Sequence, residues 1–150
     1  MPEVRLFVRN SLFLGVVLVA TALGGCRYYT ETIPEVNADD PLFGIWHLVA
    51  MQRPGAAEES IGPEPPYTLE FATSSRLAGR ADCNRFFGGY ERAGKGRIKV
   101  LAVGATQAAC PPESISGEFL RMIGAATQHE IRGTQLRLSG GDGSALIFSR

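Results

Sequence analysis

The chain has 150 residues, 45% of them hydrophobic and 20% charged, and these values suit a single globular domain with a real core. Its 15 basic and 15 acidic side chains cancel, and no basic tract offsets that balance. Because affinity for a phosphate backbone depends on clustered Lys and Arg, the composition argues against binding to nucleic acid.

Residues 1–25 are typical of a secretory signal peptide. Arg5 and Arg9 precede an apolar run over residues 12–23, and small residues follow it. Such a run is ~18 Å long as a helix, which is too short for a hydrocarbon core of about 30 Å. The alternative, a buried N-terminal helix, would need a polar face that this segment lacks. We therefore expect residues 1–25 to be removed after export.

The sequence Leu23-Gly24-Gly25-Cys26 resembles the lipobox of bacterial lipoproteins, in which the cysteine is acylated after cleavage. This resemblance implies a lipid (palmitate) anchor on Cys26, and several acyl chains on one residue give stable membrane attachment. Arg27, and not the Asp of an inner-membrane retention signal, follows the cysteine. The expected location is therefore the cell envelope, at the periplasmic face of the outer membrane. Residues 26–41 are polar and predict a flexible tether, with a folded domain over 42–150.

Segments rich in strand formers alternate with turns through most of the domain. Tyr67, Leu69 and Phe71 alternate with polar residues and predict one buried face of a strand. Residues 53–66 hold four prolines and two glycines, so we expect a loop without regular structure. The predicted strands cover residues 44–51, 67–73, 74–82, 85–92, 97–103, 129–133, 134–140 and 144–150.

Residues 111–128 break this rhythm with apolar side chains near helical spacing. Pro111 and Pro112 suit the start of a helix, where a missing amide donor costs nothing. The apolar face would comprise Ile115, Phe119, Leu120, Ile123 and Ala126. Together the elements predict an α+β domain in which a curved, mainly antiparallel sheet of about seven or eight strands packs on one helix.

If Cys26 carries lipid, Cys83 and Cys110 remain in an oxidising compartment, where disulfides persist. A bridge between them would close a loop of about 28 residues, worth ~3.5 kcal/mol in the chain-entropy model. It would tie the sheet to the segment that leads into the helix. The alternative is that both cysteines are reduced, buried and apolar in behaviour.

Metal binding and catalysis fit these residues poorly. A zinc site needs about four ligands, commonly in closely spaced pairs. Cys83 and Cys110 stand far apart in the sequence, and His47 and His129 are solitary. A neighbouring anion disfavours a thiolate, so Asp82 makes Cys83 a poorer nucleophile. We predict no catalytic residue, no metal and no cofactor.

The residues after Cys83 are expected to shape a turn and a bent strand. Asn84 tolerates left-handed backbone and can bond its own turn. Gly88 and Gly89 allow a bulge. The aromatic residues that follow Asn84 supply area to the core, with a ligand-facing role as the alternative; they are Phe86, Phe87 and Tyr90.

Six motifs in this order resemble the META domain, also called the HslJ-like domain, over residues 43–149. The most distinctive are "GRADCNRFFGGYE" and "TQAACPP", and the others are "GIWHL", "YTLEF", "EFL" and "LRLSGGDGSALIF". Ala108 and Ala109 stand where the family often carries methionine. The resemblance implies a link to bacterial stress response and novobiocin resistance, and to virulence in a protozoan relative. No enzymatic reaction is established for the family.

The expected function is therefore that of a non-enzymatic envelope lipoprotein that binds or supports another envelope component. Its partners would be the membrane, through Cys26, and an envelope protein or a hydrophobic ligand. One alternative is a carrier of lipids or hydrophobic small molecules between sheet and helix. Another is a pilot-like chaperone for an outer-membrane protein, because the family resembles a secretin-pilot lipoprotein in fold. A thiol redox enzyme is a third, which would need a free, acidic thiol.

Overall fold

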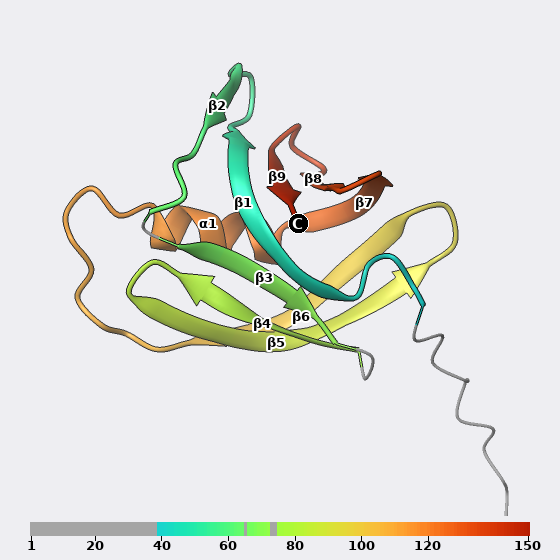
Figure 1. The fold of residues 1–150 in the computed structure, drawn as a ribbon, viewed down its shortest axis with the longest axis horizontal. Helices are drawn as coiled ribbons and strands as arrows, with labels where there is room; N and C mark the ends of the chain where they lie inside the picture. Colours follow the sequence, from blue (N-terminus) through green and yellow to red (C-terminus); the bar gives the residue numbers. More distant parts are fainter. Residues whose placement is uncertain (1–38, 65, 73–74) are drawn as a thin grey trace, which may run out of the picture. The chain divides into compact units, whose positions relative to one another are not determined.

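A computed structural model describes residues 39–150, apart from residues 65, 73 and 74 (Figure 1). The predicted signal peptide, the lipidated Cys26 and nearly all of the predicted tether lie outside the described residues. The first half of the domain holds strands only: β1 (Gly44–Gln52), β2 (Glu58–Ser60), β3 (Tyr67–Phe71), β4 (Arg76–Ala81), β5 (Asn84–Ala93) and β6 (Arg97–Ala105). The second half holds α1 (Ser116–Gly124), β7 (Ala126–Arg132), β8 (Gln135–Gly140) and β9 (Ala145–Ser149).

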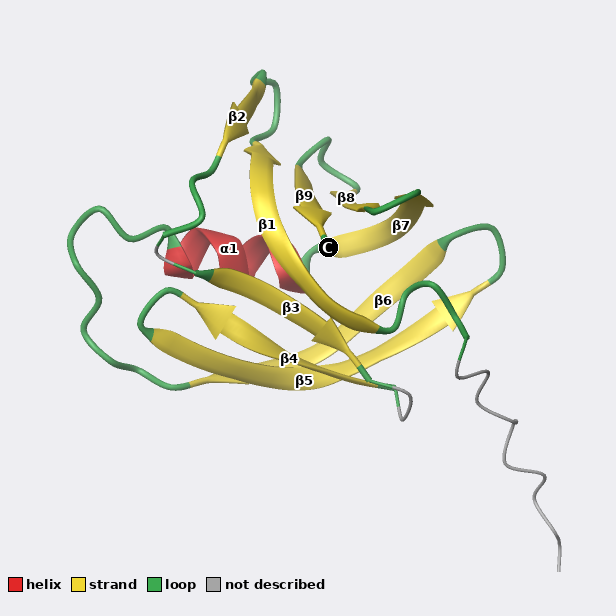
Figure 2. Cartoon of the chain, in the orientation of Figure 1, coloured by secondary structure: helices red, strands yellow, loops and turns green. Residues whose placement is uncertain are grey.

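The strands form one antiparallel sheet that closes on itself. Its order is β2-β1-β3-β4-β5-β6-β7-β8-β9, and β1 also pairs with β9. Eight strands thus make a barrel, and the short β2 pairs with the far end of β1, so that the β1–β2 hairpin projects from it (Figure 2). The predicted fold class, a curved antiparallel sheet with one helix, is confirmed, and the curvature goes as far as closure.

Register shifts at three pairings allow the strands to bend around the core. In β1, Leu48 pairs with Phe148 and Ala50 pairs with Ile147, so β1 carries one extra residue. A second shift falls at the double glycine of β5, where Gly88 pairs with Val103 and Tyr90 with Val100, so the extra residue lies in β6. A third falls in β7, between Ala126 and Gln128. A Cβ at Gly88 would lie 2.8 Å from the carbonyl oxygen of Ala102, so this position has no room for a side chain. Such bulges increase local twist and bend, which closure requires.

The helix contributes an aromatic side chain to the barrel interior. Phe119 is fully buried and meets three rings edge-on, from Tyr67 at 5.3 Å, Phe86 at 5.9 Å and Phe148 at 6.2 Å between centroids. These rings come from β3, β5 and β9, so one side chain joins strands from three parts of the barrel. Met122 is buried beside Phe119, a position that the sequence pattern did not single out.

The helix begins later than its prolines predict. Pro111 and Pro112 lie in the segment before α1, and the helix starts at Ser116. Its first backbone donors find side-chain partners instead, because the N–H of Ile115 donates to the Tyr67 hydroxyl (3.1 Å) and that of Ser116 to Ser114 Oγ (3.2 Å). These bonds satisfy groups that the helix itself leaves unpaired, so the start is set by one tertiary contact, from Tyr67, and one local contact, from Ser114.

The loop predicted over residues 53–66 also needs correction, since it contains β2. Gln52 pairs with Glu58, Met51 with Glu59 and Ala50 with Ser60. All three residues of β2 are exposed. The prolines of this segment lie outside the three paired positions, so they do not interrupt the ladder. A strand this short leaves little sequence signal.

The seam between β6 and β7 is the weakest pairing of the closed sheet. One residue pair joins the strands, Arg97 with Gln128, and the N–H of His129 donates to the carbonyl oxygen of Gly96 (2.7 Å). Nδ1 of His129 is buried without a hydrogen-bond partner among the described residues. Burial, followed by the charge of Arg92, holds the pKa of His129 below its ordinary value of 6.5.

This environment predicts a loss of stability at mildly acidic pH. A histidine whose folded pKa is lowered stabilises the fold above pH 6.5, and this contribution falls as pH drops below that value. The free energy of unfolding, measured in urea, should decrease from pH 7 to pH 5, and His129→Gln should flatten the decrease. Asp40, whose pKa is lowered by its bond to Arg92, stays ionised in this window.

The matched control is His47→Gln, at an exposed position of β1. It should keep the decrease of the wild type. Equal pH profiles for the wild type and the His129 variant would contradict the assignment.

Candidate functional site

Cys83 and Cys110 form a disulfide, with their Cα atoms 5.5 Å apart. Cys83 lies in the turn between β4 and β5, and Cys110 in the segment between β6 and α1. The sequence placed the bridge between the sheet and the approach to the helix, and the structure puts the two cysteines there. The bridge holds the residues before α1 against the β4–β5 turn.

Asn84 fastens the same corner through hydrogen bonds and is only 7% exposed. Its side-chain oxygen accepts from the N–H of Ala108 (2.8 Å) and from the hydroxyl of Thr106 (3.0 Å), while its amide donates to the carbonyl oxygen of Ala108 (3.3 Å). The sequence suggested left-handed backbone at Asn84. The structure instead places the left-handed residue of this turn at Asp82, with φ of 57°. Asn84 belongs to β5. Its amide donates to Cys83 Sγ of its own turn (3.4 Å), as expected, and its side chain also bonds the distant segment 106–110 that the disulfide brings alongside it.

A cleft of about 320 Å³ opens beside this corner, and we call it the disulfide cleft. It is lined by residues 60–62, Tyr67, Asp82, Pro111 and residues 113–115. Asp82 precedes Cys83 and Pro111 follows Cys110, so the bridge ties two walls of the cleft together.

The lining of the disulfide cleft is mostly apolar, with a few polar groups. Ile61, Pro111 and Ile115 supply aliphatic surface, and the hydroxyls of Tyr67 and Ser114 lie 3.4 Å apart. The carboxylate of Asp82 also lines it. A largely apolar pocket with a few converging polar groups is the usual form of a small-molecule site.

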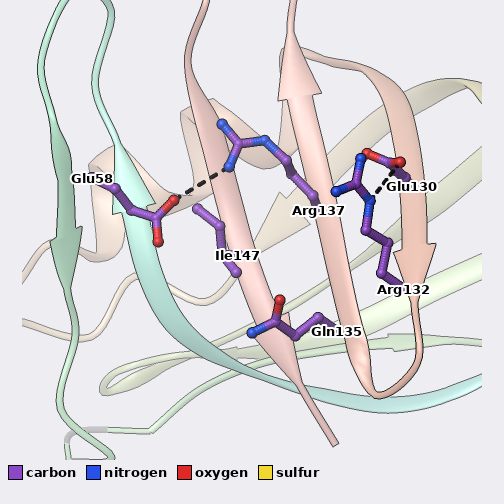
Figure 3. Close-up of a pocket in the computed structure, with 6 residues that line it drawn as sticks. All are labelled: Glu58, Glu130, Arg132, Gln135, Arg137 and Ile147. Carbon is purple, nitrogen blue, oxygen red and sulfur yellow. Dashed lines mark hydrogen bonds and ion pairs between the residues drawn. The ribbon is translucent and has the colours of Figure 1, made fainter.

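A second depression, of about 390 Å³, lies on the outer face of β8 and β9 (Figure 3). Figure 3 shows Glu58 and Arg137 directed at each other across Ile147, and the structure places them 3.3 Å apart. Arg132 and Glu130 form another ion pair at 2.8 Å. Because these charges already neutralise one another, this depression offers less to a charged ligand than the disulfide cleft does.

The three aromatic residues predicted to serve the core or a ligand divide between the two faces of β5. Phe86 packs against Phe119, and Tyr90 is buried with its hydroxyl donating to a backbone carbonyl (3.1 Å). Phe87 is 68% exposed, and its ring covers Gly104 on the neighbouring strand. An aromatic ring over a cross-strand glycine stabilises a sheet. Phe87 alone of the three can meet a molecule from solvent.

Within residues 39–150, excepting the three undescribed positions, no three or more His, Cys, Asp or Glu side chains gather as metal ligands. His47 lines a shallow surface depression on β1, and His129 lies at the β6–β7 seam near Arg92 and Asp40. In the same part of the chain, no helix has the length and apolar character needed to span a membrane.

A closed antiparallel sheet that carries one helix and a disulfide at the β4–β5 turn thus defines the domain. A family model described as the META domain matches residues 41–150. The chain belongs to this family, as its motifs indicate.

Solved structures share the fold. An NMR structure of a protein from Burkholderia xenovorans is 26% identical, with a TM-score of 0.61 over 73% of this chain and 83% of its own. A duf4847 family protein from Bacteroides vulgatus is 15% identical, with a TM-score of 0.53 over 72% and 92% of the two chains. At that identity the likeness concerns fold alone. No curated protein matches the sequence.

The contacts of Asn84 predict a measurable cost when its side chain is removed. Asn84→Ala leaves both the N–H and the carbonyl oxygen of Ala108 without their partner, and we expect a loss of about 1–3 kcal/mol in the free energy of unfolding. Amide hydrogen exchange at residues 106–110 should accelerate in the oxidised protein. Urea denaturation and exchange measured by NMR report the two effects.

Gln135→Ala removes an exposed polar side chain at the start of β8 and serves as the control, with an expected change within ~0.5 kcal/mol. Unchanged exchange at Ala108 in Asn84→Ala would show that Asn84 does not hold this segment.

Proposed function

We propose that the protein is a non-enzymatic, lipid-anchored component of the cell envelope, whose META domain binds or supports another envelope component. The disulfide between Cys83 and Cys110 is the observation that carries this proposal. Structural disulfides persist in oxidising compartments and are rare in the cytosol. The signal-like residues 1–25 and the lipobox-like sequence ending at Cys26 would deliver the chain to such a compartment. The disulfide and the signal-like N-terminal sequence thus support the same location.

In this proposal the anchor is acylated Cys26, at the periplasmic face of the outer membrane. Residues 26–41 form the tether, and a flexible chain of that length has a root-mean-square span of ~20 Å. The domain would then sample the space just above the membrane, where a partner in the envelope is within reach. Stress response and resistance to antibiotics of the novobiocin type, with which the family is associated, are the setting that we expect.

The alternative of a lipid or small-molecule carrier needs a place for its cargo. Side chains of Trp46, Phe71, Phe86, Phe119 and Phe148 are fully or almost fully buried in the barrel interior, where the cargo would compete with them. The disulfide cleft, on the surface, is the observation that favours small-molecule binding. A pilot-like chaperone for an outer-membrane protein shares the anchor and differs in its partner.

Intact-mass analysis of the full-length protein, expressed in a bacterium with an outer membrane, tests the anchor and the bridge together. The membrane fraction should yield a chain that lacks residues 1–25 and carries acyl groups on Cys26. Reduction should add the mass of two hydrogen atoms. Cys26→Ser should abolish acylation and keep the reduction shift.

Cys110→Ser is the matched control, since it should remain acylated and lose the reduction shift. An unmodified Cys26 in the wild type, with the protein in the cytosolic fraction, would overturn the proposed location. Crosslinking in intact cells should recover an envelope protein, and an outer-membrane channel among the products would favour the pilot-like role. Robust turnover of a small substrate would refute the non-enzymatic assignment.

A further inference from the structure

We propose that the disulfide cleft binds an organic cation, an ammonium or guanidinium group carried on a small apolar body. This inference concerns the folded domain and stands independently of the lipid anchor and of the envelope role proposed above. Its basis is one carboxylate without a partner in the described part of the chain, the charge balance of the lining, and the apolar surface beside that carboxylate.

The carboxylate belongs to Asp82, a residue that is only 8% exposed overall and is among those that line the cleft. No hydrogen bond or ion pair joins this carboxylate to any other residue in the described part of the chain. The nearby Arg80 guanidinium donates to the backbone carbonyl oxygen of Asp82 (3.4 Å) and not to its carboxylate. An unpaired carboxylate beside apolar surface attracts a cation more strongly than one in open solvent does. A cation in the cleft would supply a partner for it.

The backbone holds Asp82 in place for such a role. Its N–H donates to the carbonyl oxygen of Pro66 (3.2 Å), and its backbone adopts the left-handed conformation, with φ of 57°. The next residue, Cys83, is locked by the disulfide. The carboxylate is therefore presented by a rigid turn, and binding would require little reorganisation.

The charge balance of the lining also selects a cation. Glu113 adds a second, exposed carboxylate, and no Lys, Arg or His is among the residues that line the cleft. A concave surface lined by charges of one sign attracts ligands of the opposite sign. An anion would meet two carboxylates and no basic group.

The remaining lining determines the rest of the ligand. Ile61, Pro111 and Ile115 offer aliphatic contact, and Tyr67 adds its ring and hydroxyl. The cavity volume of about 320 Å³ lies at the small end of the range for small-molecule sites, ~300–1,000 Å³. A cationic head with a compact aromatic or aliphatic body fits both the volume and the chemistry.

Binding of phenethylamine to the full-length protein tests the proposal, with phenethyl alcohol as the neutral probe and phenylpropanoate as the anionic probe. Calorimetry should give at least tenfold tighter binding for phenethylamine than for either other probe. Asp82→Asn should weaken phenethylamine binding by about tenfold or more, because it removes the charge and keeps the size of the side chain. Asparagine also tolerates the left-handed backbone at this position.

Glu113→Gln should weaken binding by about twofold to threefold, since an exposed charge is screened by solvent. The matched control is Glu70→Gln, at an exposed position of β3 outside the cleft, which should bind as the wild type does. Equal affinities of the wild type for phenethylamine and phenethyl alcohol would overturn the proposal. Equal phenethylamine affinities of the wild type and Asp82→Asn would do so as well.

A stability measurement separates a ligand-binding carboxylate from a structural one. Without ligand, Asp82→Asn should unfold at about the same urea concentration as the wild type, because the carboxylate has no hydrogen bond or ion pair with the described residues that the substitution would remove. A clear loss of stability would assign Asp82 to the architecture of the turn and would count against the cation site.

Discussion

The pairing of β1 with β9 joins the first strand of the domain to the last, and the remaining features of the fold depend on it. Closure removes the exposed edges that an open sheet would present. It also imposes tight curvature, which the bulges in β1, β6 and β7 provide. The interior that closure creates must be filled, and α1 fills part of it with Phe119. In the chain, this helix lies within the connection between β6 and β7.

That connection explains why the corner around Cys83 is so heavily fastened. Residues 106–115 leave β6, pass the β4–β5 turn and return to start α1. The segment lies outside the sheet ladder, so other interactions must order it. The disulfide, the Asn84 side chain and the Tyr67 hydroxyl supply them. The disulfide cleft lies between this segment, the β4–β5 turn and the residues after β2. It forms where the connection from β6 to α1 passes the β4–β5 turn.

The sequence predicted the features that local pattern encodes. Alternation identified β3, the double glycine located the register shift between β5 and β6, and apolar spacing found the helix. Closure has no local signal, because β1 and β9 are separated by almost the whole domain. The start of α1 was predicted too early, since Tyr67, 48 residues before Ile115 in the sequence, helps to set it. The bond of Asn84 to Ala108 was missed for the same reason.

The three residues from Asp82 to Asn84 show how stability and binding can share one turn. The side chains of Cys83 and Asn84 both hold residues 106–110, through the disulfide to Cys110 and the hydrogen bond from Ala108. Asp82 takes the left-handed position, which glycine, asparagine and aspartate tolerate best. Glycine or asparagine would also suit this backbone, but only aspartate adds a negative charge to a residue that lines the cleft. Its presence beside two well-satisfied neighbours is best explained if the cleft receives a positive charge.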